Sequence, residues 1–282
     1  MKFGECVGNS PWAGKSHIFR EIDQVGRFLT FCLLSLLLLT SMGSASIKEG
    51  QPAAPRPKFS KSVSYRLIYA AGVPCHVVFV DLRSRNLRLQ AVRARDLGAR
   101  FHTFANFVRQ TRPLAAINGT FFDVRSGAII CNVVRNGRLL ESGGAGHTFA
   151  VGHDRKVRWM NTAGRAGGRV NWRNTELALS AGPTLVRKHR IVLCHEAEGF
   201  SDPGLFRQAR RSGLATTRSG RLLLVSVNRP VTLGQFAKAM KALGANDAIN
   251  LDGGTSTGLY ARGSYLSRPG RKLTNVLVVR PR

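Results

Sequence analysis

The chain has 282 residues, enough to bury a substantial core as one large domain or two small ones. Its 43% hydrophobic and 21% charged residues are typical of globular proteins and argue against a disordered chain, a collagen-like chain and a polytopic membrane protein. The 43 Lys and Arg against 15 Asp and Glu give a formal net charge of +28, which predicts attraction to polyanions. The basic residues are scattered along the chain, so a general gain in solubility explains them equally well.

The N-terminal region has the features of an export signal. The uncharged run Phe28–Thr40 follows Arg27 and leads to the small residues Ser44-Ala45-Ser46, a pattern typical of a cleavage site. We therefore expect residues 1–46 to be a signal peptide that exports the protein to the periplasm or the medium. The alternative is an uncleaved membrane anchor, because extending the run to Ile47 approaches the roughly 20 residues that span a bilayer.

Residues 47–62 are rich in Pro, Ala and Lys and are expected to form a flexible linker. A single folded domain is expected over residues 63–282, because neither a repeat nor a second shift in composition interrupts it. Ten strands are predicted from β-type apolar runs. They cover Val63–Ala70, Cys75–Asp81, Leu87–Val92, Leu114–Ile117, Ala128–Val134, Thr148–Val151, Leu177–Ser180, Leu222–Val227, Ala248–Leu251 and Val276–Val279.

Two helices are predicted among these strands. The first covers about Thr103–Arg109, where apolar residues share one helical face. The second begins after Thr232, which forms a capping-box pattern with Gln235, and stops at Gly244. Strands that outnumber helices, with each helix leading into a buried strand, predict the α+β class, with a mixed, strand-rich sheet.

Beyond the signal segment the cysteines are Cys75, Cys131 and Cys194. In an oxidising compartment they allow one disulfide, for which Cys131–Cys194 is the preferred pairing because Cys75 lies in an apolar run and is expected to be a buried thiol. No Cys-x-x-Cys pattern or His-Cys cluster occurs, so a structural zinc site is not predicted.

Three predicted strands end in a polar residue beside glycine, in residues 115–123, 180–184 and 249–256. Side chains at the ends of buried strands are held rigidly, and glycines let a ligand approach the backbone closely. A turn that follows a strand explains any one of these segments alone. Their joint occurrence favours a functional site.

Four motifs resemble the phosphodiester glycosidase family in order and approximate spacing. They are NGTFFD at residues 118–123, AGPTLV at 181–186, RSGLA at 211–215 and LDGGTS at 251–256, and the resemblance extends over about residues 63–282. Three positions depart from the family pattern, where Thr120, Ala215 and Thr255 replace frequent glycines. The family includes bacterial envelope proteins linked to exopolysaccharide. The resemblance implies an exported hydrolase that releases a sugar from a sugar-1-phosphodiester in an envelope or extracellular glycan.

The resemblance also suggests catalytic residues. Asp252 is the candidate carboxylate that attacks the anomeric carbon or activates water, and Asp123 is a candidate second acid. Arg211 is the candidate clamp that binds two phosphate oxygens with its planar fork. The alternatives are turn-forming roles for the two acids, and for Arg211 a solvated basic face shared with Arg207 and Arg210.

Further residues are expected to bind the substrate through side chains or exposed backbone. These are Asn118, Gly119, Gly182, Gly253, Gly254 and Ser256. No Gly-x-Ser-x-Gly pattern surrounds Ser256, so a serine hydrolase is not predicted.

The histidines leave the question of a metal open. His195, with Glu196 and Glu198, could form a metal or acid–base site, although a surface loop of mixed charge explains the segment better. His147 follows a glycine-rich loop. No cofactor is predicted, and a divalent cation near the phosphate stays open because no ligand spacing demands one.

A second function class is a non-catalytic cationic module that binds anionic polysaccharide. Salt would weaken such binding, whereas loss of Asp252 would not. Nucleic-acid binding has only the net charge in its favour, since no nucleic-acid-binding motif is visible and an export signal opposes it.

Overall fold

The computed structural model describes residues 62–164, 170–193 and 195–282. The expected signal segment and all but the last residue of the expected linker lie outside these ranges, and so does Cys194. Among the described residues, no helix is long and apolar enough to cross a membrane.

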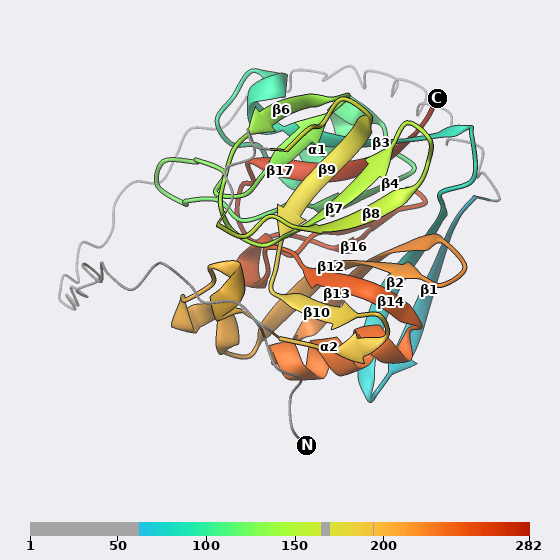
Figure 1. Cartoon of the computed structure of the whole chain (residues 1–282), viewed down its shortest axis with the longest axis vertical. Coiled ribbons are helices and arrows are strands. Elements are labelled where there is room, and N and C mark those ends of the chain that lie inside the picture. Colours follow the sequence, from blue (N-terminus) through green and yellow to red (C-terminus); the bar gives the residue numbers. More distant parts are fainter. Residues whose placement is uncertain (1–61, 165–169, 194) are drawn as a thin grey trace, which may run out of the picture. The chain divides into compact units, whose positions relative to one another are not determined.

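The strands form three sheets, and every pairing between neighbouring strands is antiparallel. The seven-stranded sheet runs, in spatial order, β1 (Val63–Ala70), β2 (Val73–Asp81), β13 (Arg221–Val231), β12 (Ala209–Thr217), β14 (Ala245–Asn250), β10 (Thr184–Arg187) and β11 (Arg190–Ile191). The β4 sheet runs β16 (Ser264–Ser267), β15 (Leu259–Ala261), β4 (Ala115–Asn118), β17 (Asn275–Pro281) and β3 (Leu87–Arg93). The β9 sheet runs β6 (Arg138–Glu141), β5 (Val133–Arg135), β9 (Thr175–Ala181), β7 (His147–Gly152) and β8 (Val157–Asn161). The course of the chain is visible in Figure 1.

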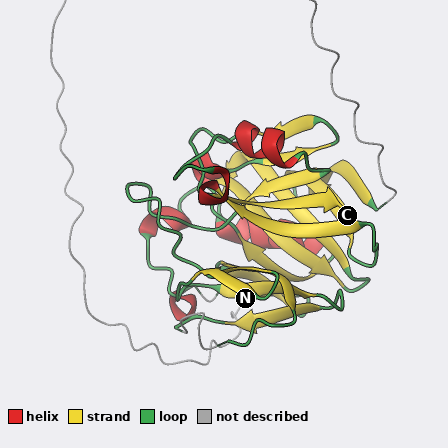
Figure 2. Cartoon of the chain, turned by 90° about the horizontal axis from the view of Figure 1, so that it is seen from above, coloured by secondary structure: helices red, strands yellow, loops and turns green. Residues whose placement is uncertain are grey.

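The three sheets share one core. Buried side chains from each sheet, such as Val78 on β2, Leu89 on β3 and Leu179 on β9, belong to a single apolar cluster. Figure 2 shows the strands in layers, with short helices and long loops gathered along one side. This shared burial makes the described residues one unit rather than three independent sheets.

Both predicted helices are present. The helix α1 (Phe104–Thr111) begins after Thr103, whose side chain accepts a hydrogen bond from the Asn106 N–H, and it packs on the β4 sheet. The helix α2 (Leu233–Ala242) begins with the predicted capping box between Thr232 and Gln235 and packs on the seven-stranded sheet. The α+β class is therefore confirmed.

Apart from strands that the sequence did not predict, such as β10, β12 and β15, the structure departs from the sequence prediction in two respects. The sheets are antiparallel rather than mixed, because hairpins and antiparallel crossings connect all the paired strands. Most of the predicted strand Ala128–Val134 is a loop with one isolated bridge, between Phe122 and Ile129, and a strand begins only at Val133. Its exposed Ile130 lies beside the cavity described below instead of in the core.

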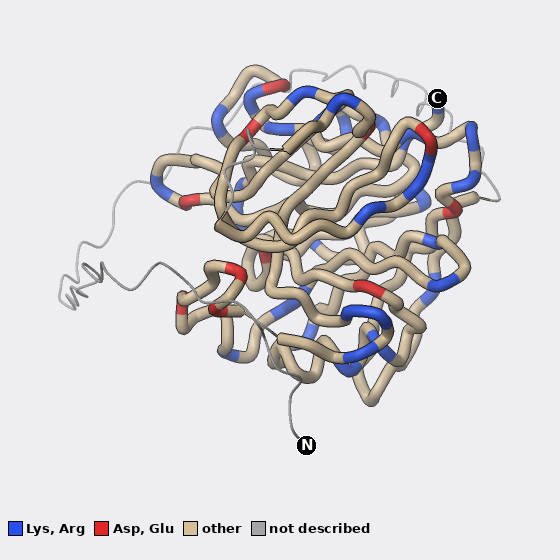
Figure 3. Tube along the Cα trace, in the orientation of Figure 1, with Lys and Arg blue, Asp and Glu red and all other residues tan. Residues whose placement is uncertain are grey.

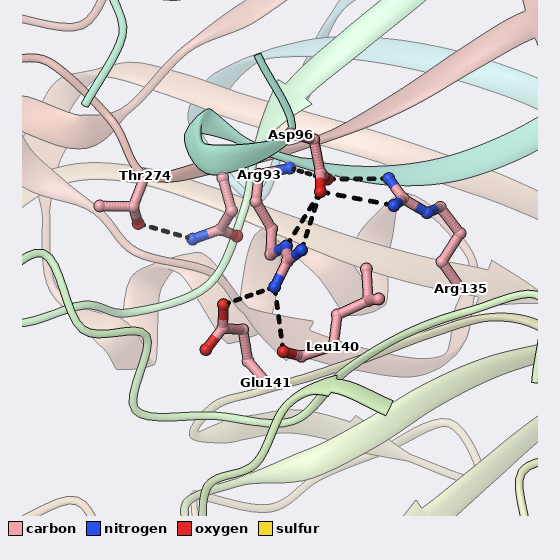
Figure 4. Close-up of polar contacts among 7 residues, drawn as sticks. Arg93, Asp96, Arg135, Leu140, Glu141 and Thr274 are labelled. Carbon is pink, nitrogen blue, oxygen red and sulfur yellow. Dashed lines mark hydrogen bonds and ion pairs between the residues drawn. The ribbon is translucent and has the colours of Figure 1, made fainter. Parts of the chain in front are cut away.

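A polar network joins the β4 and β9 sheets (Figure 4). The Asp96 carboxylate accepts hydrogen bonds from Arg93 at 2.8 Å and from Arg135 at 2.8 Å. Arg93 also donates to the Glu141 carboxylate at 2.9 Å and to the Leu140 carbonyl oxygen at 3.0 Å. Because Arg93 ends β3 while Arg135 and Glu141 end β5 and β6, these contacts fasten one sheet to the other.

Lys and Arg are distributed over many loops and strands and do not form one block (Figure 3). Cys75 and Cys131 are buried free thiols, as expected for Cys75. The proposed pairing of Cys131 involves Cys194, which lies outside the described residues.

Candidate active site

The candidate site lies where β14 of the seven-stranded sheet and β4 of the neighbouring sheet end. Asn118, the last residue of β4, donates from Nδ2 to the Asp252 carbonyl oxygen at 2.7 Å and accepts from the Gly258 N–H at 3.0 Å. The Ser212 hydroxyl donates to the same Asp252 oxygen at 2.9 Å. The backbone of Asp252 is therefore held from two strands, while its carboxylate is left to the cavity that it lines.

Asn118 is brought to Asp252, but not in the predicted role. Its amide is buried, with 1% exposed, and is occupied by the Gly119 and Asp252 carbonyl oxygens and the Gly258 N–H. It also does not belong to the lining of the cavity. Asn118 thus positions the loop that carries Asp252, and its amide is not free to bind a ligand.

The Asp252 carboxyl group has a shifted acidity. Burial raises its pKa to about 6, although the Ser256 hydroxyl, the Arg271 charge and the Gly253 N–H all favour the charged form. A carboxyl group with this pKa is ionised at neutral pH and is much more basic than an exposed aspartate. These are properties that suit a nucleophile or a general base.

Arg211 lies in the same cavity lining and is almost fully buried. Its Nε donates to the Val231 carbonyl oxygen at 3.1 Å, and its Nη2 donates to the Leu205 carbonyl oxygen at 3.0 Å and to the Arg207 carbonyl oxygen. Burial lowers the pKa of Arg211 to about 10, so the group stays charged at neutral pH.

These contacts change the predicted role of Arg211, which was to bind two phosphate oxygens with its planar guanidinium group. With Nε and Nη2 committed to carbonyl oxygens, Nη1 is the Arg211 nitrogen for which the described residues supply no acceptor. A Cβ atom added at Gly253 would lie 3.9 Å from Nη1, which places this nitrogen beside the glycine loop. Arg211 therefore offers the two N–H groups of one nitrogen from a fixed position, instead of a movable fork.

The cavity has a volume of about 530 Å³ and takes its charged lining from Arg211 and Asp252 and from the exposed Arg271 and Asp202. The predicted glycines Gly253 and Gly254 also line it. A Cβ at Gly253 would lie 2.9 Å from the Arg210 carbonyl oxygen, and Gly254 has a φ of +59°, which favours glycine. The loop therefore presents bare backbone to a ligand.

Gly119, Gly182 and Ser256 were also predicted to bind the substrate. Gly119 and Gly182 are packing glycines, because a Cβ would lie 1.7 Å from Asn275 Oδ1 at the first position and 2.5 Å from the Phe200 ring at the second. Ser256 lies one short helical turn after Asp252, and its buried hydroxyl acts on the Asp252 carboxyl group, whose charged form it favours.

Asp123 is not brought to the site. It is exposed, it is absent from the cavity lining, and its Oδ1 accepts from the Arg125 and Ser126 N–H groups at 3.1 and 2.6 Å. These bonds hold a tight turn and keep the pKa of Asp123 below its usual value. The turn-forming alternative describes the placement of Asp123, and the preceding Phe121 and Phe122 reach the cavity instead.

The acidic segment after Cys194 also differs from expectation. Glu198 turns inward, accepts from the Thr184 N–H at 2.9 Å and lies 3.2 Å from His147 Nδ1, whereas Glu196 stays exposed. The described residues contain no group of three or more His, Cys, Asp or Glu side chains arranged to hold a metal ion.

Arg271 and Phe200 were missed by sequence reasoning. Neither lies within the four motifs, and one arginine among many gives no local signal; only the folded chain brings them beside Asp252.

The sequence matches the phosphodiester glycosidase family over residues 111–280, and the chain belongs to this family. No curated protein matches the chain significantly in sequence.

Solved structures share the fold. A Synechocystis protein described as hypothetical has 19% identity and a TM-score of 0.62, with 78% of this chain and 62% of that chain covered. The catalytic domain of zebrafish N-acetylglucosamine-1-phosphodiester alpha-N-acetylglucosaminidase, auto-inhibited by its pro-peptide, has 21% identity and a TM-score of 0.60, with 78% and 82% covered. A putative exported protein of Burkholderia pseudomallei has 13% identity and a TM-score of 0.55, with 76% of each chain covered.

Proposed function

We propose that the protein is an exported phosphodiester glycosidase that releases a sugar from a sugar-1-phosphodiester in an envelope or extracellular glycan. One observation carries the proposal: a carboxylate of raised pKa, Asp252, and two arginines, Arg211 and Arg271, line the same cavity. The carboxylate suits an anomeric carbon that gains positive charge, and the guanidinium groups suit the phosphate beside it.

The reaction breaks the bond between C1 of the sugar and the bridging oxygen. Water supplies the new hydroxyl at C1, the bridging oxygen leaves with the phosphate as a monoester, and one proton is released to solvent at neutral pH. Asp252 either activates this water by accepting its proton or attacks C1 first and is then displaced by water.

A second catalytic acid is not required by this chemistry. The phosphate monoester is a stable anion, so its departure needs charge stabilisation more than protonation. Arg211 Nη1, Arg271 and the backbone of Gly253 and Gly254 are the groups in the cavity suited to stabilise it. This division of labour is consistent with Asp123 lying outside the cavity.

Export remains part of the proposal because of the apolar segment Phe28–Thr40. The alternative function, a non-catalytic module for anionic polysaccharide, draws on the Lys and Arg residues that are distributed over the chain (Figure 3).

The test is release of reducing sugar from a panel of sugar-1-phosphodiesters. We expect Asp252→Asn to lower kcat by at least about 1000-fold, the scale of losing an activated nucleophile or base. Asp123→Asn is the matched control, since it makes the same chemical change in an exposed turn acid of the neighbouring motif, and it should keep activity within about threefold. Salt-sensitive glycan binding with no sugar release by the unmodified protein would favour the binding module.

A further inference from the structure

Two exposed aliphatic side chains belong to the candidate active-site cavity. Val124 is 57% exposed and Ile130 is 46% exposed, and both line the cavity together with Asp252. They lie in the loop that follows β4, whose ends are held together by the bridge between Phe122 and Ile129. Branched aliphatic groups kept in water beside a binding cavity indicate a surface that is covered when ligand binds.

A second loop extends this apolar surface. Phe200 and Leu205 come from the segment before β12 and line the same cavity. The Phe200 ring packs against the Phe121 ring with centroids 5.2 Å apart, which joins the two loops. The apolar lining therefore comes from two loops that touch at Phe121 and Phe200, and it includes the exposed Val124 and Ile130.

Exposure gives the order of groups along the cavity. Arg211 is almost fully buried and Asp252 is partly buried, whereas Arg271, Val124 and Ile130 are exposed. The anomeric carbon has to reach Asp252, and the phosphate follows it toward Arg211 and Arg271. The group on the far side of the phosphate then extends toward the exposed aliphatic side chains.

Val124 and Ile130 offer no hydrogen bonds to a hydroxylated group, and the exposed polar residues of the lining, Ser201, Asp202 and Thr255, come from other loops. An apolar chain would instead remove aliphatic and aromatic surface from water. We infer that the group beyond the phosphate is an apolar chain, of the alkyl or isoprenoid class, and that Val124 and Ile130 bind its first carbons. This inference rests on the proposed function for the orientation of the substrate.

The binding test uses the product that would carry the chain and needs no knowledge of the sugar. Calorimetry compares hexyl phosphate with glycerol 3-phosphate, with inorganic phosphate as the baseline. Hexyl phosphate should bind at least about tenfold more tightly, the gain expected from burying a few methylene groups. In the Val124→Ser, Ile130→Ser double variant the two affinities should become equal within about twofold, and Arg271→Gln should weaken both ligands.

Leu67→Ser is the matched control, because Leu67 is 51% exposed on β1 and is not part of the cavity. It should keep the full preference for hexyl phosphate. Equal affinities in the unmodified protein, or a preference that survives in the double variant, would overturn the inference.

A second arm distinguishes a soluble chain from a membrane lipid. Vesicles of phosphatidylcholine are compared with and without a small fraction of a dialkyl phosphate, in about 0.15 M salt to limit attraction by charge alone. If the unmodified protein sediments with the phosphate-bearing vesicles and the double variant does not, the apolar chain belongs to a membrane lipid. Preference for free hexyl phosphate with no such sedimentation identifies a soluble chain.

Failure of the inference and failure of the proposed function give different results. If sugar is released from diesters with polar and apolar groups at equal kcat/KM, the glycosidase stands and the apolar-chain inference falls. If hexyl phosphate binds through Val124 and Ile130 but no sugar is released from alkyl-linked sugar-1-phosphates, the glycosidase falls and the binding surface stands.

Discussion

At the scale of single residues, Asp252 has the environment that a reactive carboxylate needs. Its backbone is fixed by Asn118 and Ser212, and burial shifts its pKa to about 6. One oxygen of the Asp123 carboxylate, in the motif at residues 118–123, accepts the hydrogen bonds of a turn, and the residue is exposed. Two aspartates that look alike in the sequence therefore differ in chemistry because of their surroundings.

The raised pKa predicts the pH dependence of activity. Because the reaction needs the charged carboxylate, kcat/KM should rise with pH through about 6 and fall about tenfold for each pH unit below that value. The measurement is kcat/KM as a function of pH, with any substrate that the protein hydrolyses. The fall on the acidic side is called the acidic limb. A rate that stays constant between about pH 4 and 8 would show that Asp252 is not the titrating group.

Arg271 should influence that limb, because its charge lowers the pKa of Asp252 and so opposes the effect of burial. Arg271→Gln should move the acidic limb upward by about half a pH unit and raise KM about tenfold through the lost phosphate contact. Arg271→Lys should restore the position of the limb more fully than KM, since lysine keeps the charge but not the planar guanidinium. An unmoved limb in Arg271→Gln would remove Arg271 from the site.

At the scale of elements, the site depends on the ends of β4 and β14 meeting the beginning of β12. Asn118 connects the end of β4 to the loop after β14, and Ser212 on β12 contacts the same loop. These elements are far apart in the chain, so the site forms only when two different sheets pack.

Asn118→Ala should therefore affect both stability and catalysis. It removes three hydrogen bonds and leaves the buried Gly258 N–H without its acceptor, at a cost of about 2 to 4 kcal/mol in the free energy of unfolding. Ser212→Ala removes one donor and should cost about 1 kcal/mol. Denaturant titration and kcat for the two variants check this order, and an equal, small effect of both would contradict the positioning role.

The sequence predicted local elements better than their assembly. The capping box at Thr232 and the strand Val63–Ala70 were identified from local patterns alone, because caps and apolar runs depend on near neighbours. The strand β12 was missed because it begins with the polar residues Arg210 and Arg211. Its burial comes from pairing with β13 and β14, which its own sequence does not reveal.

The sequence predicted only part of the candidate site. Asp252 and Arg211 were placed together through their motifs, while Arg271, Phe200 and the inward turn of Glu198 depend on tertiary packing that no local signal reports.

At the scale of the whole molecule, a shared core and the polar network in Figure 4 hold the three sheets together. Burial alone would raise the pKa of Asp96, but hydrogen bonds from Arg93 and Arg135 outweigh it and hold this pKa below its usual value. A depressed pKa in the folded state contributes stability above the unfolded pKa, near 4, and this contribution is lost as the pH falls through the lower folded value.

Asp96→Asn should thus lower the free energy of unfolding at neutral pH by about 1 to 3 kcal/mol. Because the unmodified protein loses the same contribution in acid, the difference between the two proteins should shrink below about pH 4. Asp154→Asn, which removes an exposed carboxylate paired with Arg158, is the control and should leave the free energy of unfolding nearly unchanged. A difference for Asp96→Asn that is independent of pH would contradict the electrostatic account.

The central claim is that the protein breaks the bond between carbon and oxygen at C1 of the sugar and not the bond between phosphorus and oxygen. The most direct test is hydrolysis of a sugar-1-phosphodiester substrate in water enriched in oxygen-18. Phosphorus NMR then shows whether the released phosphate monoester carries the label. The phosphate carries no label if water attacks C1, as the placement of Asp252 and the arginines predicts. One labelled oxygen in the phosphate would mean attack at phosphorus and would contradict the account.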